Sequence, residues 1–188
     1  MKCRSRLQTH AALIETAAGR GRARLAYCGA SLEVPDLMPP PPDHVPVPAV
    51  PLWLGASGLI PFILLAGALW ISPVDYHPVL HDWIRTYAAV ILSFIGAIHW
   101  GVAMVHRDMT DHDRALLMGW SVVPSLVAWF GLLMPLRTGL ALAAAMFIVH
   151  YTMDRQLVTR FDLPGWYLRL RGGLTAVVVV CLGIAAIR

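Results

Sequence analysis

The chain has 188 residues, of which 57% are hydrophobic and only 14% are charged. Soluble domains carry about a quarter charged residues, so this composition excludes an ordinary soluble protein and places most of the chain in lipid. The net charge of +4 comes largely from scattered arginines, without a basic stripe interleaved with aromatic residues, which argues against nucleic-acid binding.

Residues 1–51 are predicted to be a disordered extension that precedes the fold. Residues 1–33 are basic and poor in acidic residues, as in a transit peptide or a disordered arm. Residues 39–51 are too rich in proline for a helix or a sheet and should form an extended linker. Met38 would serve as an alternative start, so residues 1–37 belong either to the mature protein or to an overextended reading frame.

Residues 52–188 are predicted to form an all-α integral membrane bundle of five transmembrane helices. A helix that rises about 1.5 Å per residue needs roughly 20 residues to cross the hydrocarbon core, and the apolar stretches approach that length. Pro61 should kink the first span without breaking it, and residues 135–139 should form a tight turn. The predicted spans cover residues 52–71, 86–105, 115–136, 138–153 and 166–187.

The second span carries a small residue at every fourth position. This spacing places the four residues on one face of the helix, where they should form a groove that other helices pack against. The helix-packing residues predicted in this way are Ala89, Ser93, Ala97 and Gly101.

The last span begins at the interface. Pro164 is a predicted helix start, and Trp166 and Tyr167 are predicted to belong to an aromatic belt. The charged ends of Arg169 and Arg171 are expected to reach the lipid headgroups.

The distribution of arginines predicts the orientation of the chain in the membrane. Connections on the cytoplasmic side of bacterial membrane proteins carry the excess of Lys and Arg. We expect the protein to lie in the inner membrane of a bacterium, or of a mitochondrion if it is eukaryotic. The rule then places its N-terminus in the cytoplasm or in the matrix, respectively. The C-terminus is then outside. Six arginines flank the spans on the N-terminal side and three flank them on the opposite side: Arg107, Arg114, Arg155, Arg160, Arg169 and Arg171, against Arg85, Arg137 and Arg188.

His99 and His150 are the candidate site residues. Counted along the second and fourth spans, the two imidazoles lie at a similar depth in the bilayer. Such a pair could bind the iron of haem b axially, or it could join a polar network with Tyr151, Asp154 and Arg155 that passes protons. The alternative, which we favour, is that each ring forms a hydrogen bond across a helix interface and stabilises the packing.

Two other clusters contain ligand-type side chains, but neither has the spacing of a metal site. His77 and His81 would share a helix face, yet Pro78 between them weakens the helix, so residues 72–85 are predicted to be a solvated loop. The charged loop after the second span lacks the glycine and distal glutamate of an EF-hand. No metal site is predicted.

Three motifs resemble those of a known family. They are SFIGAIHWG at residues 93–101, SVVPSLVAW at residues 121–129 and LPGWYLRLR at residues 163–171. The chain resembles, over about residues 52–187, a family of small membrane proteins classed as a domain of unknown function. This family occurs in proteobacteria and has a similar transmembrane protein in animal mitochondria. Ala97 departs from the family pattern, where a second glycine is expected. The resemblance implies no reaction, substrate or cofactor.

The chain contains no phosphate-binding glycine loop, nucleophile elbow or His-Glu-x-x-His motif, so no catalytic residue is predicted. The predicted function is a non-enzymatic accessory or assembly partner of a larger membrane complex, with the lipid bilayer and other membrane subunits as partners. The alternative is a small carrier that binds haem or handles protons through His99 and His150. A transporter is a third alternative, weakened because five spans do not divide into equal inverted halves.

Overall fold

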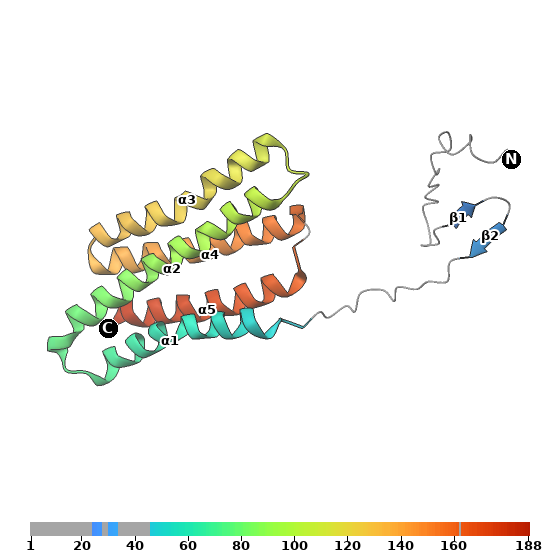
Figure 1. Cartoon of the computed structure of the whole chain (residues 1–188). Helices are drawn as coiled ribbons and strands as arrows, with labels where there is room; N and C mark the ends of the chain where they lie inside the picture. Colours follow the sequence, from blue (N-terminus) through green and yellow to red (C-terminus); the bar gives the residue numbers. More distant parts are fainter. Residues whose placement is uncertain (1–23, 28–29, 34–45, 162) are drawn as a thin grey trace. The chain divides into compact units, whose positions relative to one another are not determined.

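The computed structural model describes residues 24–27, 30–33, 46–161 and 163–188 (Figure 1). The chain divides into two units, Met1–Val45 and Pro46–Arg188. In the first unit, β1 (Arg24–Tyr27) and β2 (Ala30–Glu33) pair in antiparallel orientation, with Arg24 opposite Glu33. The sequence did not predict this hairpin. The other residues before 46 lie outside the described part, so the disorder of the extension stays a prediction.

The second unit consists of five long helices and one short 3-10 turn, η1 (Val74–Tyr76). All five helices are long and apolar enough to cross a bilayer, which confirms the predicted five-helix membrane fold. The chain is therefore an integral membrane protein. The helices are α1 (Ala49–Ile71), α2 (His77–Val105), α3 (Asp111–Leu133), α4 (Leu136–Phe161) and α5 (Gly165–Ile187).

Three helices extend at least four residues beyond their predicted spans at one end, because polar residues continue the helices into the interface. Helix α2 begins at His77, with Pro78 in its first turn, where a missing N–H breaks no helical bond. Helix α3 begins at Asp111, where the Thr110 hydroxyl accepts a hydrogen bond from the Asp113 N–H at 3.1 Å. Helix α4 continues to Phe161 instead of ending near residue 153.

The turn between α3 and α4 is shorter than predicted. Helix α3 ends at Leu133 and α4 begins at Leu136, so Gly139 belongs to α4 and not to the turn. A Cβ at Gly139 would collide with the Gly131 carbonyl, so this glycine allows the two helices to approach closely. Arg85 of α2 donates hydrogen bonds to the Leu132 and Met134 carbonyls and so binds the end of α3 to α2.

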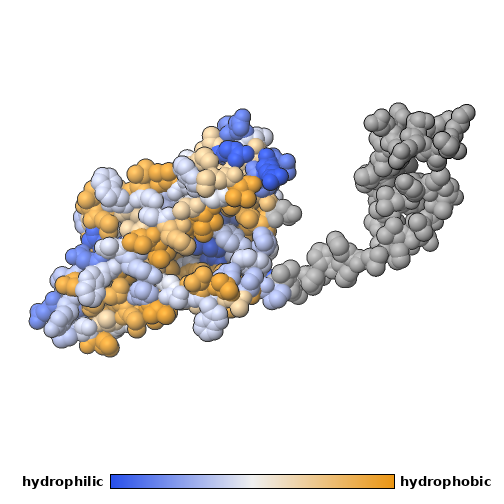
Figure 2. Space-filling view, in the orientation of Figure 1, coloured by the Kyte–Doolittle hydropathy of each residue, from blue (hydrophilic) through white to orange (hydrophobic). Residues whose placement is uncertain are grey.

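The helices pack as a bundle in which α1 and α4 each contact both α2 and α5, while α3 contacts α2 and α4 (Figure 1). The buried core includes Phe62, Ile84, Leu92, Phe147 and Leu182. Figure 2 shows apolar residues along the sides of the bundle, and strongly hydrophilic residues mostly near its two ends. This surface suits a bilayer, where side chains on the outside contact lipid.

Within the bundle, α2 uses only part of the predicted groove of small residues, because Ala89 packs against the core while the others do not. Ser93 and Ala97 are exposed, and a Cβ at Gly101 would meet no atom within 4 Å. Gly96 packs instead, because a Cβ there would lie 2.5 Å from the Ser121 carbonyl oxygen of α3. The packing face is therefore rotated away from the predicted one, and the role of the exposed face as a docking surface for another protein stays a prediction.

Candidate functional site

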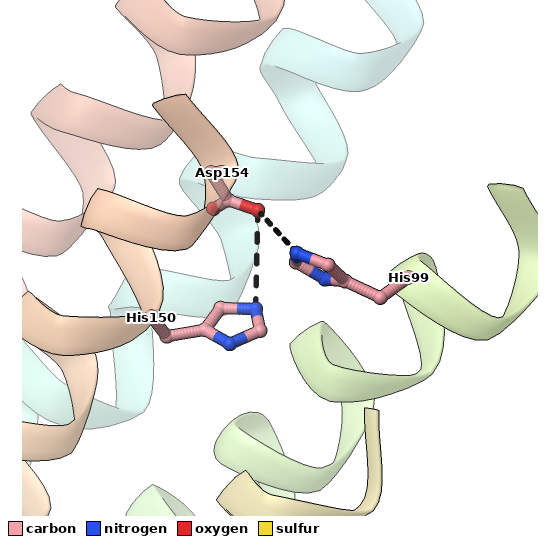
Figure 3. A group of neighbouring side chains, drawn as sticks. All are labelled: His99, His150 and Asp154. Atoms are coloured by element: carbon pink, nitrogen blue, oxygen red, sulfur yellow. Dashed lines mark ion pairs between the residues drawn. The ribbon is translucent and has the colours of Figure 1, made fainter. Parts of the chain in front are cut away.

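Helices α2 and α4 bring three titratable side chains together inside the bundle (Figure 3). His150 and Asp154 lie four residues apart on α4 and so share one face, while His99 enters from α2. One carboxylate oxygen, Oδ1 of Asp154, lies 3.8 Å from Nε2 of His99 and 3.9 Å from Nε2 of His150. All three side chains are at most 1% exposed. The His99–His150–Asp154 group is called the buried triad below.

Helix α5 completes the site with a cation and a hydroxyl. Nε of Arg171 donates to Oδ2 of Asp154 at 2.8 Å, and the Tyr167 hydroxyl donates to Oδ1 at 3.0 Å. Arg171 is buried, so its charge is compensated by Asp154 and not by lipid headgroups. With both imidazoles neutral, the formal charges of Asp154 and Arg171 cancel, so the five side chains of the site carry no net charge.

The site lies about two helical turns from one end of the bundle, with His99 and Arg171 inside their predicted spans and Asp154 one residue beyond the predicted fourth span. His99 is six residues before the end of α2, Asp154 seven before the end of α4, and Arg171 six after the start of α5, which places them about 9–10 Å inside the helix ends. Because successive helices alternate in direction, these three ends lie on the same side of the bundle. Ionisable groups at this depth are costly and mark functional sites.

The histidines differ in their partners. Nε2 of His150 lies 3.2 Å from the Ile95 carbonyl oxygen, to which it can donate, and its ring stacks on Trp120 at an interplanar angle of 9°. His99 has both ring nitrogens buried without a hydrogen-bond partner among the described residues. A buried imidazole in this state is unusual, because buried polar groups in folded proteins normally have partners.

The structure brings together some of the predicted site residues and not others. His99, His150 and Asp154 meet, whereas Arg155 is exposed and Tyr151 lies beside Gly172, where a Cβ would be 3.1 Å from its hydroxyl. Neither shows a hydrogen bond to the buried triad, although both were predicted to join the network. The close approach at Gly172 brings α4 and α5 near enough for Asp154 to reach α5.

Sequence reasoning missed Arg171 and Tyr167, which it assigned to the headgroup region and the aromatic belt. Tyr167, Arg171 and Thr175 follow one another at intervals of four residues and therefore share one face of α5. A polar face within an apolar span is a signal that could have identified them. The depth of Arg171 alone did not identify it, because the residue lies near enough to the start of α5 for its charged end to reach the headgroups.

The prediction that residues 72–85 form a solvated loop is also wrong. His77 and His81 are buried in the first turns of α2, with their rings 6.1 Å apart. Nε2 of His81 lies 3.1 Å from the Ala185 carbonyl oxygen of α5, which explains its burial as a helix-to-helix hydrogen bond.

The buried triad does not fit haem b. The His99 and His150 ring centroids are 4.7 Å apart at an interplanar angle of 64°, so the rings touch edge to face. An iron bound axially by both rings would require the macrocycle between them. Three donor atoms of the triad lie within 4.8 Å of one another, a spacing that a metal ion could bridge. The Arg171 guanidinium, which already occupies the carboxylate, opposes a second cation there.

The fold and the site together define an integral membrane protein of five helices with a charged, hydrogen-bonded site buried between its helices toward one side of the membrane. The family model described as Protein of unknown function (DUF3429) matches residues 47–187, and the chain belongs to this family. This finding confirms the resemblance suggested by the three sequence motifs.

The chain is 35% identical over 143 residues to Transmembrane protein 69 of Xenopus tropicalis, an alignment that covers 73% of this chain and 53% of the frog protein. The chain therefore spans about half the length of that relative. No solved structure matches this chain.

Proposed function

We propose that this protein handles protons within the membrane through the buried triad. The observation that carries the proposal is the arrangement at Asp154, where both imidazoles lie within 4 Å of one carboxylate oxygen in a site without exposure. Histidine and aspartate chains of this kind serve as proton relays in membrane pumps and transporters.

Each residue has a defined role in this proposal. His99, whose two ring nitrogens have no partner in the described chain, receives the proton. Asp154 stabilises the resulting imidazolium, and His150 lies at the same carboxylate oxygen as the second acceptor. Arg171 and Tyr167 hold the carboxylate in place through their hydrogen bonds to its two oxygens.

Proton entry into liposomes tests the proposal. Purified protein is reconstituted with a pH-sensitive dye inside the vesicles, and a potassium diffusion potential drives protons inward. We expect faster acidification than in protein-free vesicles, and Asp154→Asn or His99→Gln should reduce the rate by about a hundredfold, the low end of the effect of a positioned proton-transfer group.

His112→Gln is the matched control, because His112 is exposed at the start of α3 and outside the triad. Its rate should equal that of the unaltered protein. Equal rates for the unaltered protein and Asp154→Asn would contradict the proposal and leave the triad as a packing contact.

The accessory or assembly role that the sequence suggested remains a second prediction. The part of the predicted groove outside the bundle, where Ser93 and Ala97 are exposed and Gly101 has open surroundings, is available to another membrane protein, yet it is equally able to contact lipid. The buried triad supports proton handling more strongly, because no packing need within the chain explains an unpartnered His99.

A further inference from the structure

Two buried histidines line a pocket at the end of the bundle where α2 begins. His77 and His81 are 8% and 6% exposed, and the pocket that they line has a volume of about 460 Å³. His77 is the first residue of α2 and His99 lies near its end, so the pocket is about 33 Å from the buried triad at 1.5 Å per residue. The pocket is therefore separate from the proton-handling site.

Helix α2 brings the two imidazoles close together. The sequence predicts no metal at these residues because Pro78 weakens a helix there. In the structure Pro78 lies in the first turn of α2, where proline is tolerated, so His77 and His81 share one helix face. Their ring centroids are 6.1 Å apart. A metal ion bound at about 2 Å by one nitrogen of each ring would separate the ring centres by roughly 5 to 6.5 Å.

The hydrogen bonds of the two rings define which nitrogen carries the lone pair. Nε2 of His81 lies 3.1 Å from the Ala185 carbonyl oxygen, and Nε2 of His77 lies 3.4 Å from the Ser72 carbonyl oxygen. Because a carbonyl oxygen can only accept, Nε2 carries the hydrogen in each neutral ring and Nδ1 carries the lone pair. Histidines that bind a metal usually donate their other N–H to a backbone carbonyl or a carboxylate in this way.

The two Nδ1 atoms are open to the pocket. In the described part of the chain, the histidine nitrogens that are closed off without a partner belong to His99, His106 and His150. Nδ1 of His77 and Nδ1 of His81 are not among these closed atoms, and the hydrogen bonds of both rings use Nε2. Since the rest of each side chain is buried, the open nitrogens face the pocket that both rings line. The pocket thus presents two accessible lone pairs.

The charges around the pocket restrict what these lone pairs can bind. Arg85 and Arg188 also line it, but each donates to backbone carbonyls of residues outside the lining. Asp82 lines it as well, is 75% exposed and lies 3.9 Å from Arg85, and an ion pair so exposed is weak. One carboxylate cannot supply the several oxygen ligands that Ca²⁺ and Mg²⁺ require, whereas imidazole nitrogen suits zinc and copper.

We propose that His77 and His81 bind a transition-metal ion of the zinc and copper class through their Nδ1 atoms, with Asp82 as the third ligand. Three protein ligands leave a position for water, which the exposure of Asp82 allows to enter. Binding leaves Nε2 of His81 on the Ala185 carbonyl oxygen, so the contact between α2 and α5 is kept.

Zinc titration of the full chain in detergent micelles tests this proposal. The protein is treated with a chelator, transferred to chelator-free buffer and titrated with Zn²⁺ in a calorimeter, with protein-free micelles as the blank. We expect saturable binding of one ion per chain. His77→Gln and His81→Gln should each weaken binding by more than about tenfold, since even the loss of a group that only orients a metal ligand has an effect of this size.

Asp82→Asn is a milder variant, because the Asp82 side chain is mostly exposed and its removal leaves the packing intact. It should fold normally and weaken Zn²⁺ binding by about tenfold. His112→Gln and Asp154→Asn are the controls, since His112 is exposed at the start of α3 and Asp154 belongs to the buried triad. Both should bind Zn²⁺ within about twofold of the unaltered protein.

Electron paramagnetic resonance of the unaltered protein with one equivalent of Cu²⁺ gives a readout that needs no variant. Two imidazole ligands should split the copper signal through their nitrogen nuclei. A copper signal without nitrogen splitting would overturn the site, as would unchanged Zn²⁺ affinity in His77→Gln and His81→Gln. Loss of Zn²⁺ binding in Asp154→Asn would place the ion at the buried triad instead. Binding of Ca²⁺ as tight as that of Zn²⁺ would indicate carboxylate ligands and contradict the histidine site.

Discussion

At the scale of single residues, the Asp154–Arg171 pair is the most consequential contact in the molecule. It joins α4 to α5 at 2.8 Å and places a compensated ion pair in a lipid-surrounded core. A buried pair is costly to desolvate, but removing one partner leaves the other charge uncompensated and costs far more. The pair therefore contributes to the geometry of the site more than to net stability.

Arg171→Met should lower the free energy of unfolding by about 3–5 kcal/mol, because Asp154 is then buried without its cation. The double variant Asp154→Leu with Arg171→Met should recover most of this loss, since two apolar side chains need no compensation. Unfolding by increasing SDS in mixed micelles measures both values. A double variant as unstable as Arg171→Met would show that the loss has another origin.

At the scale of elements, close approach at glycine decides how α2 and α3 pack. The position of a Cβ at Gly96 is 2.5 Å from the Ser121 carbonyl oxygen and 3.3 Å from Cγ of Pro124. The first of these atoms belongs to the backbone, which yields less readily than a side chain. Any larger residue at this position must therefore separate the two helices.

Gly96→Ala should destabilise the protein by about 1–3 kcal/mol, the usual cost of overpacking a well-packed interface. Gly101→Ala, five residues further along α2, meets no atom within 4 Å, so it should be neutral or gain up to about 1 kcal/mol from helix propensity. Thermal unfolding, monitored by circular dichroism, measures the melting temperatures of the two variants. Equal melting temperatures would contradict the rotated packing face.

At the scale of the whole molecule, the odd number of spans places the two ends of the bundle on opposite sides of the membrane. Because Arg171 is paired inside the bundle, it no longer contributes to the orientation signal. The remaining count still favours the N-terminal side, with five arginines against three: Arg107, Arg114, Arg155, Arg160 and Arg169, against Arg85, Arg137 and Arg188.

Labelling of single cysteines tests this orientation in a bacterial inner membrane. In a background without Cys3, Cys28 and Cys181, Arg137→Cys should react with an impermeant maleimide in intact spheroplasts. Asp108→Cys, in the connection between α2 and α3, should react only after lysis. The reverse pattern would place the N-terminal side of the bundle outside.

The sequence by itself determined the five spans, because the length of an apolar stretch is compared directly with the thickness of the bilayer. It was less accurate at the helix ends, since polar residues such as those from His77 to Arg85 continue α2 beyond the apolar stretch. It also placed His99 and His150 at a similar depth, because depth follows from counting along helices that alternate in direction.

Only the tertiary structure decided which faces of the helices meet. Apolar side chains lie on both the lipid-facing and the packed faces of these helices, so hydropathy is a weak guide to rotation about the helix axis. A rotation by one residue replaces Ala97 with Gly96 at the packing face. The same rotation determines that Arg171 reaches Asp154 while Arg155 is exposed. The buried triad therefore follows from helix packing, where side-chain shape and pairing of buried charges select one arrangement.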